Sequence, residues 1–408
     1  MARFEDLSPE EQAETLKAYR ELTDNKTALE DLQADIDARR QGYGEVWRTG
    51  FDKLDEKLDG GLMGEQLIFL GAISSLGKTS YALQIATQIA EQGKDVLIFS
   101  LEMSKNELNA KTISRYTYQL TDKGYDKKTG EAIRDPRQAY RLTTRDILSG
   151  RVGGIAFGQG TDEQGKLFIE ALAQTQKLSE NTRIFVGEND VDVDKVREVV
   201  DVHIRATGKR PLVVLDYLQI LQPSTEATTT DKRLLTDYDV TRLKVISRDF
   251  HIPVLVISAF NRTSYLESVS MGSFRESSGI EYSSDILLAM QYQGMDYQKH
   301  KYKNEDGELV DVYENKQDHD MRIRELLEKM DTDGSNGLEL PIELKILKNR
   351  NGSKGTLFYH FLPKYNFYRE TETSSYKYRY QKKTAGGNAS SVVSSTGSTG
   401  ITIGSKVK

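Results

Sequence analysis

Residues 66–86 read QLIFLGAISSLGKTSYALQIA, and this stretch decides the fold. The apolar run at its start predicts a buried strand, and the apolar spacing after Thr79 predicts a helix. Between them lies a glycine-containing loop that ends in Gly77, Lys78 and Thr79. A loop of this kind turns backbone N–H groups and a helix N-terminus toward bound phosphate. The stretch therefore predicts a phosphate-binding turn at the edge of an α/β sheet.

This order of strand, loop, Gly-Lys-Thr and helix is the P-loop of nucleoside triphosphatases. Lys78 is predicted to reach the β and γ phosphates of ATP, and the Thr79 hydroxyl to ligate Mg²⁺. The predicted nucleotide-binding residues are Ser74, Ser75, Leu76, Gly77, Lys78, Thr79 and Ser80. One position departs from the general pattern, because Ala72 stands where the first glycine is usual.

Composition limits the class of protein. The chain has 408 residues, of which 37% are hydrophobic and 29% charged, so one large or two small domains with an ample core are expected. No apolar run approaches the roughly 20 residues that cross a bilayer, and the polar N-terminus does not resemble a secretory signal. We therefore expect a cytoplasmic protein without a membrane partner. The absence of cysteine excludes disulfides and thiolate metal sites. A net charge of −6 does not indicate nucleic-acid binding, although an acidic protein can hold a local basic channel.

From Trp47 onward, apolar runs alternate with helical patterns, which predicts a mostly parallel sheet covered by helices. The predicted strands are 67–71, 95–100, 184–187, 212–216, 253–258 and 285–290, followed by 341–348 and 356–362. The predicted helices are 79–92, 104–119, 193–207 and 232–250. The highly charged residues 293–338 are predicted to form a surface insertion.

Three regions follow from this organisation: a helical N-terminal segment (1–45), the ATPase domain (46–370) and a flexible, disordered tail (371–408). Residues 8–40 are predicted to be helical, with Ser8 as the N-cap. Leucine or isoleucine recurs every seven residues within them, at Leu22, Leu29 and Ile36. The apolar stripe packs either on its own domain or on a neighbouring subunit, and the sequence leaves both open.

Two carboxylates follow predicted strands. Asp216 ends the apolar run 212–215, and Glu102 comes two residues after the strand that follows the P-loop helix. In open α/β sheets ligands bind at the carboxyl ends of the strands, so Asp216 is the expected Mg²⁺ partner. Glu102 is a candidate general base for the attacking water. Taken alone, Asp216 could begin a turn and Glu102 could cap a helix.

Several motifs together resemble the DnaB family of replicative helicases. They occur in order over roughly residues 47–365, as Thr49-Gly50-Phe51 with Leu54-Asp55, Gly60-Gly61-Leu62, Ala72 to Thr79, Ser100-Leu101-Glu102-Met103, Leu215-Asp216-Tyr217-Leu218-Gln219, Ser258 to Arg262, Phe274 to Glu281 with Asp285, and Lys348 to Gly352 with Gly355. The resemblance implies a RecA-like ATPase core. Alanine at the position of Ala72 is common in this family, so the departure from the general P-loop pattern is a match to the family pattern.

The resemblance also implies roles. Lys78 and Thr79 would bind phosphate and Mg²⁺, Asp216 would hold the metal and Glu102 would be the catalytic base. Lys348 and Arg350 would reach the γ-phosphate bound by the adjacent subunit, as an arginine finger does. Without the resemblance, these two cations would be interpreted as a basic turn before an Asn-Gly hairpin.

The same resemblance implies a DNA-binding loop in the channel of a ring. Arg275, Glu276, Ser278 and Gly279 would hold the phosphates of single-stranded DNA, through contacts that do not depend on base sequence. The family glycine falls at Ser278 here. Lys232 and Arg233, at the end of the stretch 222–233, form a second candidate channel loop; a flexible polar loop is the alternative for this stretch.

Two features differ from the family. Ala259 stands where the family has a glutamine that senses the γ-phosphate, and about 45 residues precede the core, so we expect a trimmed relative without the globular N-terminal domain.

We expect an ATP- and Mg²⁺-dependent homohexameric helicase that translocates on single-stranded DNA, with primase or a helicase loader as further candidate partners. The alternatives are a RecA-type recombination or repair ATPase, and a non-catalytic DNA-binding ring that interferes with a host helicase.

Overall fold

The computed structural model describes residues 8–12, 15, 25–40, 45–124, 133–153, 155–156, 159–160, 162–187, 191–224, 231–261, 265–274, 277–303 and 309–374. The chain divides into two units, Met1–Val46 and Trp47–Lys408. The domain limits predicted above stay predictions, and most of the predicted tail lies outside the described residues. In the part that the structure describes, every helix is too short or too polar to cross a membrane.

The first unit contains helix α2 (Asn25–Arg40). Farther toward the N-terminus, the Ser8 and Glu11 side chains each accept a hydrogen bond from the other's backbone N–H, which confirms the predicted N-cap. On α2, Leu29, Leu32 and Ile36 lie on one face and are exposed. Whether this stripe packs on its own domain or on a neighbouring subunit stays open.

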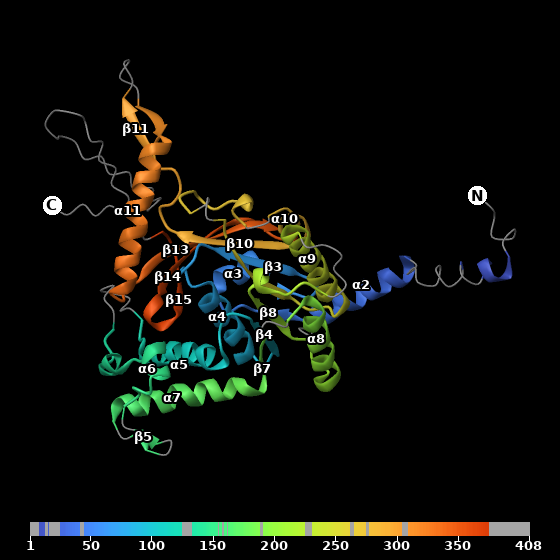
Figure 1. Ribbon diagram of the computed structural model, residues 1–408, viewed down its shortest axis with the longest axis horizontal. Coiled ribbons are helices and arrows are strands. Elements are labelled where there is room, and N and C mark those ends of the chain that lie inside the picture. The colour runs from blue at the N-terminus through green and yellow to red at the C-terminus, as the bar shows by residue number, and fades with distance from the viewer. Residues whose placement is uncertain are drawn as a thin grey trace, which may run out of the picture. The chain divides into compact units, whose positions relative to one another are not determined.

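The second unit is built on a nine-stranded sheet (Figure 1). Its spatial order is β15 (Phe367–Thr371), β14 (Gly355–Leu362), β13 (Leu340–Asn349), β10 (Ile286–Tyr292), β3 (Leu67–Ala72), β9 (Val254–Ala259), β8 (Leu212–Asp216), β4 (Val96–Ser100) and β7 (Thr182–Val186). The six strands from β10 to β7 are parallel, and the other three join as antiparallel neighbours. Every residue of β3, β4 and β8 is buried, as expected for a sheet covered on both faces. The predicted α/β class with a mostly parallel sheet is confirmed.

The large helices match the predicted ones closely. They are α4 (Lys78–Glu91), α5 (Lys105–Thr121), α8 (Val193–Thr207) and α9 (Lys232–Asp249). Helix α7 (Glu163–Lys177) was not predicted, and it lies beside α5 (Figure 1). It buries Leu167 and Ala171 but carries a glycine in its first turn, which weakens the helical pattern.

Short elements connect these. They are β1 (Val46–Trp47), α3 (Asp52–Lys57), β2 (Leu62–Met63), η2 (Pro136–Tyr140), α6 (Thr144–Leu148), β5 (Ile155–Ala156), β6 (Gln159–Gly160), η3 (Leu178–Glu180), η4 (Leu218–Ile220), η6 (Met271–Ser273), α10 (Ser277–Ser283) and η7 (Pro363–Tyr365). In the motif that begins at Thr49, the Asp55 carboxylate accepts hydrogen bonds from the Thr49 backbone N–H and hydroxyl. These residues therefore have a structural role at the start of the domain.

The predicted surface insertion is folded. It contains strands β11 (Lys299–Lys303) and β12 (Leu309–Tyr313) and helix α11 (Lys316–Ser335), which extend beyond the antiparallel end of the sheet (Figure 1). Ile323, Leu326 and Met330 lie at helical spacing and are buried. The insertion is therefore attached through an apolar helix face, which its high charge concealed in the sequence.

Candidate nucleotide-binding site

The candidate site lies at one edge of the sheet, where parallel strands end. The P-loop follows β3, Asp216 ends β8, and Glu102 comes two residues after the end of β4. Ser100 pairs with Asp216 in the sheet register, so these strands end at the same level. Lys78, Glu102 and Asp216 line one cavity of about 500 Å³, which we call the nucleotide cavity. The structure thus brings together three side chains that the sequence scatters over some 140 positions.

Gly77 ends the P-loop and has a left-handed backbone, with φ 79° and ψ 29°. A Cβ atom at this position would lie 2.5 Å from the Phe361 ring and 2.7 Å from the Tyr368 hydroxyl. Both the backbone and the surrounding space therefore require glycine here. The same turn directs the first N–H groups of α4 into the nucleotide cavity, and an anion at a helix N-terminus is stabilised by them.

Aromatic side chains of β14 and β15 pack against the P-loop and the start of α4. Tyr368 on β15 donates a hydrogen bond to the Leu76 carbonyl of the loop. Its ring stacks on Phe361 of β14 with centroids 4.2 Å apart, and it meets Tyr81 of α4 edge to face at 5.0 Å. The C-terminal hairpin therefore fixes the position of the loop, which the sequence around residue 78 does not reveal.

The Lys78 ammonium group lies inside the nucleotide cavity. Its Nζ donates hydrogen bonds to the carbonyls of Ala72 and Ile73, at 3.1 and 3.2 Å. Burial lowers the pKa of Lys78, while the nearby carboxylates of Asp216 and Glu102 oppose that shift. A cation held by neutral carbonyls in a partly buried cavity is well placed to bind an anion.

Asp216 has the features of a metal-binding carboxylate. Burial raises its pKa to about 6, and the Thr79 hydroxyl next to it acts in the opposite direction. Its Oδ2 atom is buried and has no hydrogen-bond partner among the described residues. An unpaired buried oxygen beside a threonine hydroxyl is the donor set that a hard divalent cation prefers. The residues present therefore fit Mg²⁺.

Glu102 lies in a tight turn between β4 and α5. The Ser100 hydroxyl donates to the Met103 carbonyl at 2.7 Å and closes this turn. Ser104 then caps α5 through reciprocal bonds with Glu107. The capping glutamate is therefore Glu107, which leaves the exposed Glu102 carboxylate free to face the nucleotide cavity.

Lys111 on α5 and Asn366 after η7 also line the nucleotide cavity, and neither was predicted. Lys111 follows Ser104 by seven residues, so the helical period places it on the same face of α5 as the N-cap that follows Glu102; that period was the available signal. Asn366 reaches the site only because β14 and β15 pack beneath the P-loop, and no local pattern marks it.

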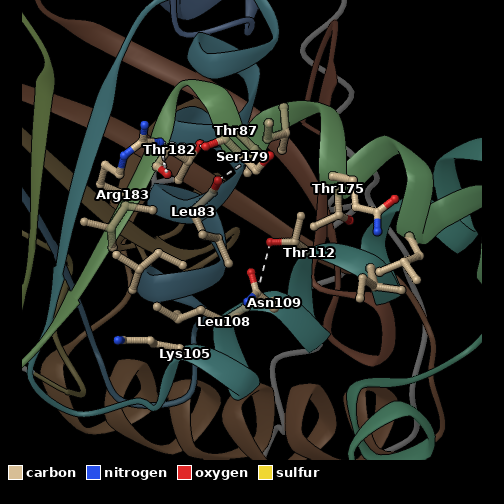
Figure 2. Close-up of a pocket in the computed structure, with 16 residues that line it drawn as sticks. Leu83, Thr87, Lys105, Leu108, Asn109, Thr112, Thr175, Ser179, Thr182 and Arg183 are labelled. Atoms are coloured by element: carbon tan, nitrogen blue, oxygen red, sulfur yellow. Dashed lines mark hydrogen bonds between the residues drawn. The ribbon is translucent and has the colours of Figure 1, made fainter. Parts of the chain in front are cut away.

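A larger cavity of about 580 Å³ lies between α4, α5, α7 and β7 (Figure 2). Its walls are mainly apolar, and the hydroxyls of Thr87 and Thr112 donate to carbonyls of their own helices. No cluster of acids and bases converges there in the part of the chain that the structure describes. The charged side chains of Lys78, Glu102 and Asp216 instead line the smaller nucleotide cavity.

Comparison with known proteins agrees with this geometry. The family described as DnaB-like helicase C terminal domain matches residues 47–132 and 155–370, well over half of the chain. The chain belongs to this family. Replicative DNA helicase DnaB of Helicobacter pylori (strain ATCC 700392 / 26695) is 24% identical over 370 residues, which cover 89% of this chain and 67% of that protein. Replicative DNA helicase DnaB of Geobacillus stearothermophilus is 24% identical over 323 residues, which cover 78% and 55%. The chain thus spans roughly half to two thirds of the length of these curated relatives.

Solved structures share the fold. One of them, an isolated ATPase domain, superposes with a TM-score of 0.61 at 19% identity, over 86% of this chain and 100% of that one. A DnaB-like replicative helicase, solved with its interactions with primase, gives a TM-score of 0.59 at 19% identity, over 87% and 70%. These matches confirm the RecA-like α/β fold predicted for this member of the DnaB-like family.

The predicted finger residues of this DnaB-like chain lie away from its own nucleotide cavity. Lys348 pairs with Leu287 of β10, which in turn pairs with Phe69 of β3. Arg350 lies at the level of Asp285, near the start of β10, and contacts its carboxylate at 3.3 Å. At about 3.3 Å per residue, the pair is about 10–16 Å from the P-loop along the strands, and it is also two strands away. Neither cation therefore serves the phosphates of its own chain.

The two predicted DNA-binding stretches meet in space. Arg233, in the first turn of α9, donates to the Ser278 hydroxyl of α10 at 2.7 Å. Gly279 approaches α9 so closely that a Cβ would lie 2.0 Å from the Asp237 carboxylate. Lys232 begins α9 and lines a separate cavity of about 460 Å³. Arg275 and Glu276 lie outside the described residues.

The position of the family glutamine, Ala259, lies at the end of β9 and lines the nucleotide cavity. Gln219 reaches it from η4: its Oε1 accepts from the Ala259 N–H at 3.3 Å, and its Nε2 donates to the Ser258 hydroxyl at 2.9 Å. In this DnaB-like chain, the Gln219 amide, which follows the neighbouring strand β8, thus bonds to the groups on either side of the Ala259 methyl: the Ala259 backbone N–H and the Ser258 hydroxyl.

Proposed function

We propose that this chain is the subunit of an ATP-dependent homohexameric DNA helicase that translocates on single-stranded DNA and unwinds the duplex ahead of it. One observation carries the proposal. Lys78, Thr79, Glu102 and Asp216 share the nucleotide cavity, whereas the basic finger pair lies toward the opposite edge of the same sheet. A complete ATPase site then needs two copies of the chain, arranged head to tail, and such an arrangement gives a ring where the rotation between successive copies closes.

The residues of the site divide the work of hydrolysis. Lys78 and the N–H groups at the start of α4 bind the phosphates, while Thr79 and Asp216 hold Mg²⁺. The bound metal would neutralise charge on the β and γ phosphate oxygens. Glu102 orients the attacking water and accepts its proton. Lys348 and Arg350 of the adjacent copy stabilise the charge that develops on the transferred phosphoryl group.

DNA binding rests on the surface where α9 meets α10. Lys232, Arg233, Ser278 and Gly279 offer ammonium, guanidinium, hydroxyl and backbone groups to DNA phosphates. Arg275 and Glu276, which lie outside the described residues, remain predicted DNA-binding residues. Contacts of this kind are independent of sequence and weaken with salt. Primase remains a candidate partner, since one structural neighbour was solved with its interactions with primase. A helicase loader remains a candidate on the family resemblance alone.

The decisive experiment measures ATP turnover with and without single-stranded DNA, followed by strand displacement on a forked duplex. A helicase turns over ATP faster with DNA and displaces the strand. Turnover without displacement would favour the RecA-type alternative, and absence of turnover would favour a non-catalytic ring. Glu102→Gln is the matched variant, which should bind nucleotide and DNA yet hydrolyse ATP at least about 100-fold more slowly.

A further inference from the structure

Lys111 places a second ammonium group in the nucleotide cavity. It projects from α5, whereas Lys78 comes from the end of the P-loop itself. Its Nζ donates to the Asn366 amide oxygen at 2.8 Å and approaches the Ser80 hydroxyl at 3.5 Å. Ser80 belongs to the first turn of α4, whose N–H groups face bound phosphate. Lys111 therefore lies beside the phosphate-binding turn.

The partners of Lys111 are neutral. Within the described part of the chain, no acidic oxygen lies at ion-pair distance from its Nζ, and its contacts are the Asn366 amide and the Ser80 hydroxyl. Burial lowers the pKa of Lys111, while Asp216, Glu107 and Glu102 act from farther away in the opposite direction. A partly buried ammonium without a carboxylate partner is costly unless an anion completes its coordination.

Asn366 is built to hold this lysine in place. It has a left-handed backbone with φ 54°, which asparagine tolerates, and its side chain is buried. Its amide oxygen accepts from both Ser80 and Lys111, and its amide nitrogen donates to the Thr144 hydroxyl of α6 at 2.9 Å. The amide thus ties α4, α5 and α6 together around the ammonium group.

We infer that Lys111 is a second phosphate-binding lysine of the nucleotide cavity, which exchanges its bond to Asn366 for a contact with the phosphates of a bound nucleoside polyphosphate. This inference rests on the proposed function, because it concerns the same cavity. Lys78 approaches the phosphates from the loop and Lys111 from α5, so two cations from different elements enclose the polyphosphate.

The test measures the Kd of Mg·ATP and of tripolyphosphate, each by competition with a fluorescent nucleotide. Lys111→Met should raise both Kd values about 10- to 100-fold, the size of one charge-assisted hydrogen bond. The matched control is Lys105→Met, which removes the same charge from the same helix at an exposed position outside the nucleotide cavity. It should leave both Kd values within about twofold.

Two further variants separate phosphate binding from a structural role. Lys111→Gln can still donate to Asn366, so a structural lysine would be replaced by it without loss, whereas a phosphate-binding lysine would not. Lys111→Arg keeps the charge and should retain most of the affinity. The melting temperature of the nucleotide-free protein should not fall in Lys111→Met, because an unpaired buried charge is removed.

The outcomes are distinct. If wild type binds ATP and Lys111→Gln matches it, the inference about Lys111 is wrong while the proposed function stands. A lower nucleotide-free melting temperature in Lys111→Met combined with full affinity in Lys111→Gln would identify a structural residue. If wild type binds no nucleotide, the proposed function itself fails.

Discussion

Gly77 is the residue of the P-loop with the least freedom to change. Alanine there would have to adopt φ 79° and place its Cβ 2.5 Å from the Phe361 ring. Gly93 is a matched control, since it has φ 77° but no atom within 4 Å of the place that a Cβ would take. We expect Gly93→Ala to cost about 1 kcal/mol of unfolding free energy and Gly77→Ala about 2–4 kcal/mol. Urea unfolding measures both; equal losses would mean that the loop shifts away from the aromatic rings.

The buried carboxyl group of Asp239 should make the free energy of unfolding depend on pH. It is 6% exposed on α9, and burial together with Asp192 and Asp194 raises its pKa to about 7. Between about pH 4 and pH 7 the folded protein holds a proton that the unfolded chain has lost, so stability falls as pH rises. Asp239→Asn should therefore be about 2–4 kcal/mol more stable than wild type at pH 8 and equal to it at pH 4. Parallel stability curves for the two proteins would show that Asp239 is not the titrating group.

At the scale of elements, sequence reasoning succeeded where one strand or one helix carries the signal. The strand before the P-loop, the ending of β8 at Asp216 and the turn after β4 at Glu102 follow from apolar runs that stop at polar residues. Parallel strands then bring these endings together without further information. Asn366 and Tyr368 could not be found in this way, because their place in the site depends on how a distant hairpin packs under α4.

Tyr368 of β15 does not line the nucleotide cavity, yet it should affect nucleotide binding through its bond to the P-loop. Tyr368→Phe removes the donor to the Leu76 carbonyl and leaves that buried acceptor without its bond. We expect a loss of about 1–3 kcal/mol of unfolding free energy, together with weaker Mg·ATP binding. Tyr365→Phe is the control, because this partly buried ring packs against Tyr118 away from the P-loop, and about 0.5 kcal/mol or less should be lost. Chemical unfolding and nucleotide titration check both; unchanged affinity in Tyr368→Phe would show that the loop holds its shape without the hairpin.

At the scale of the whole molecule, the sheet separates the predicted phosphate-binding residues from the predicted finger residues. The carboxyl ends of the parallel strands carry the predicted phosphate-binding residues, whereas Lys348 near the end of the antiparallel strand β13 and Arg350 just after it lie toward the opposite ends of those strands. This separation depends on the spatial order of the nine strands, which cannot be read from any single segment of the sequence. The motif resemblance indicated that the finger acts on an adjacent subunit; the register supplies a physical reason, since the distance is too great within one chain.

A subunit-mixing experiment tests this arrangement in the assembled protein. Arg350→Ala keeps Glu102 but loses its finger, and Glu102→Gln keeps the finger but loses its base. Each alone should hydrolyse ATP slowly, with Arg350→Ala reduced about 10³-fold while nucleotide binding is retained. In rings mixed one to one, roughly a quarter of the interfaces combine an intact Glu102 with an intact Arg350, so a comparable share of wild-type turnover should return. The exposed Lys354 of the same turn gives the control variant, Lys354→Ala, which should hydrolyse ATP at the wild-type rate. If mixing restores nothing although the two variants assemble together, the finger does not act between subunits.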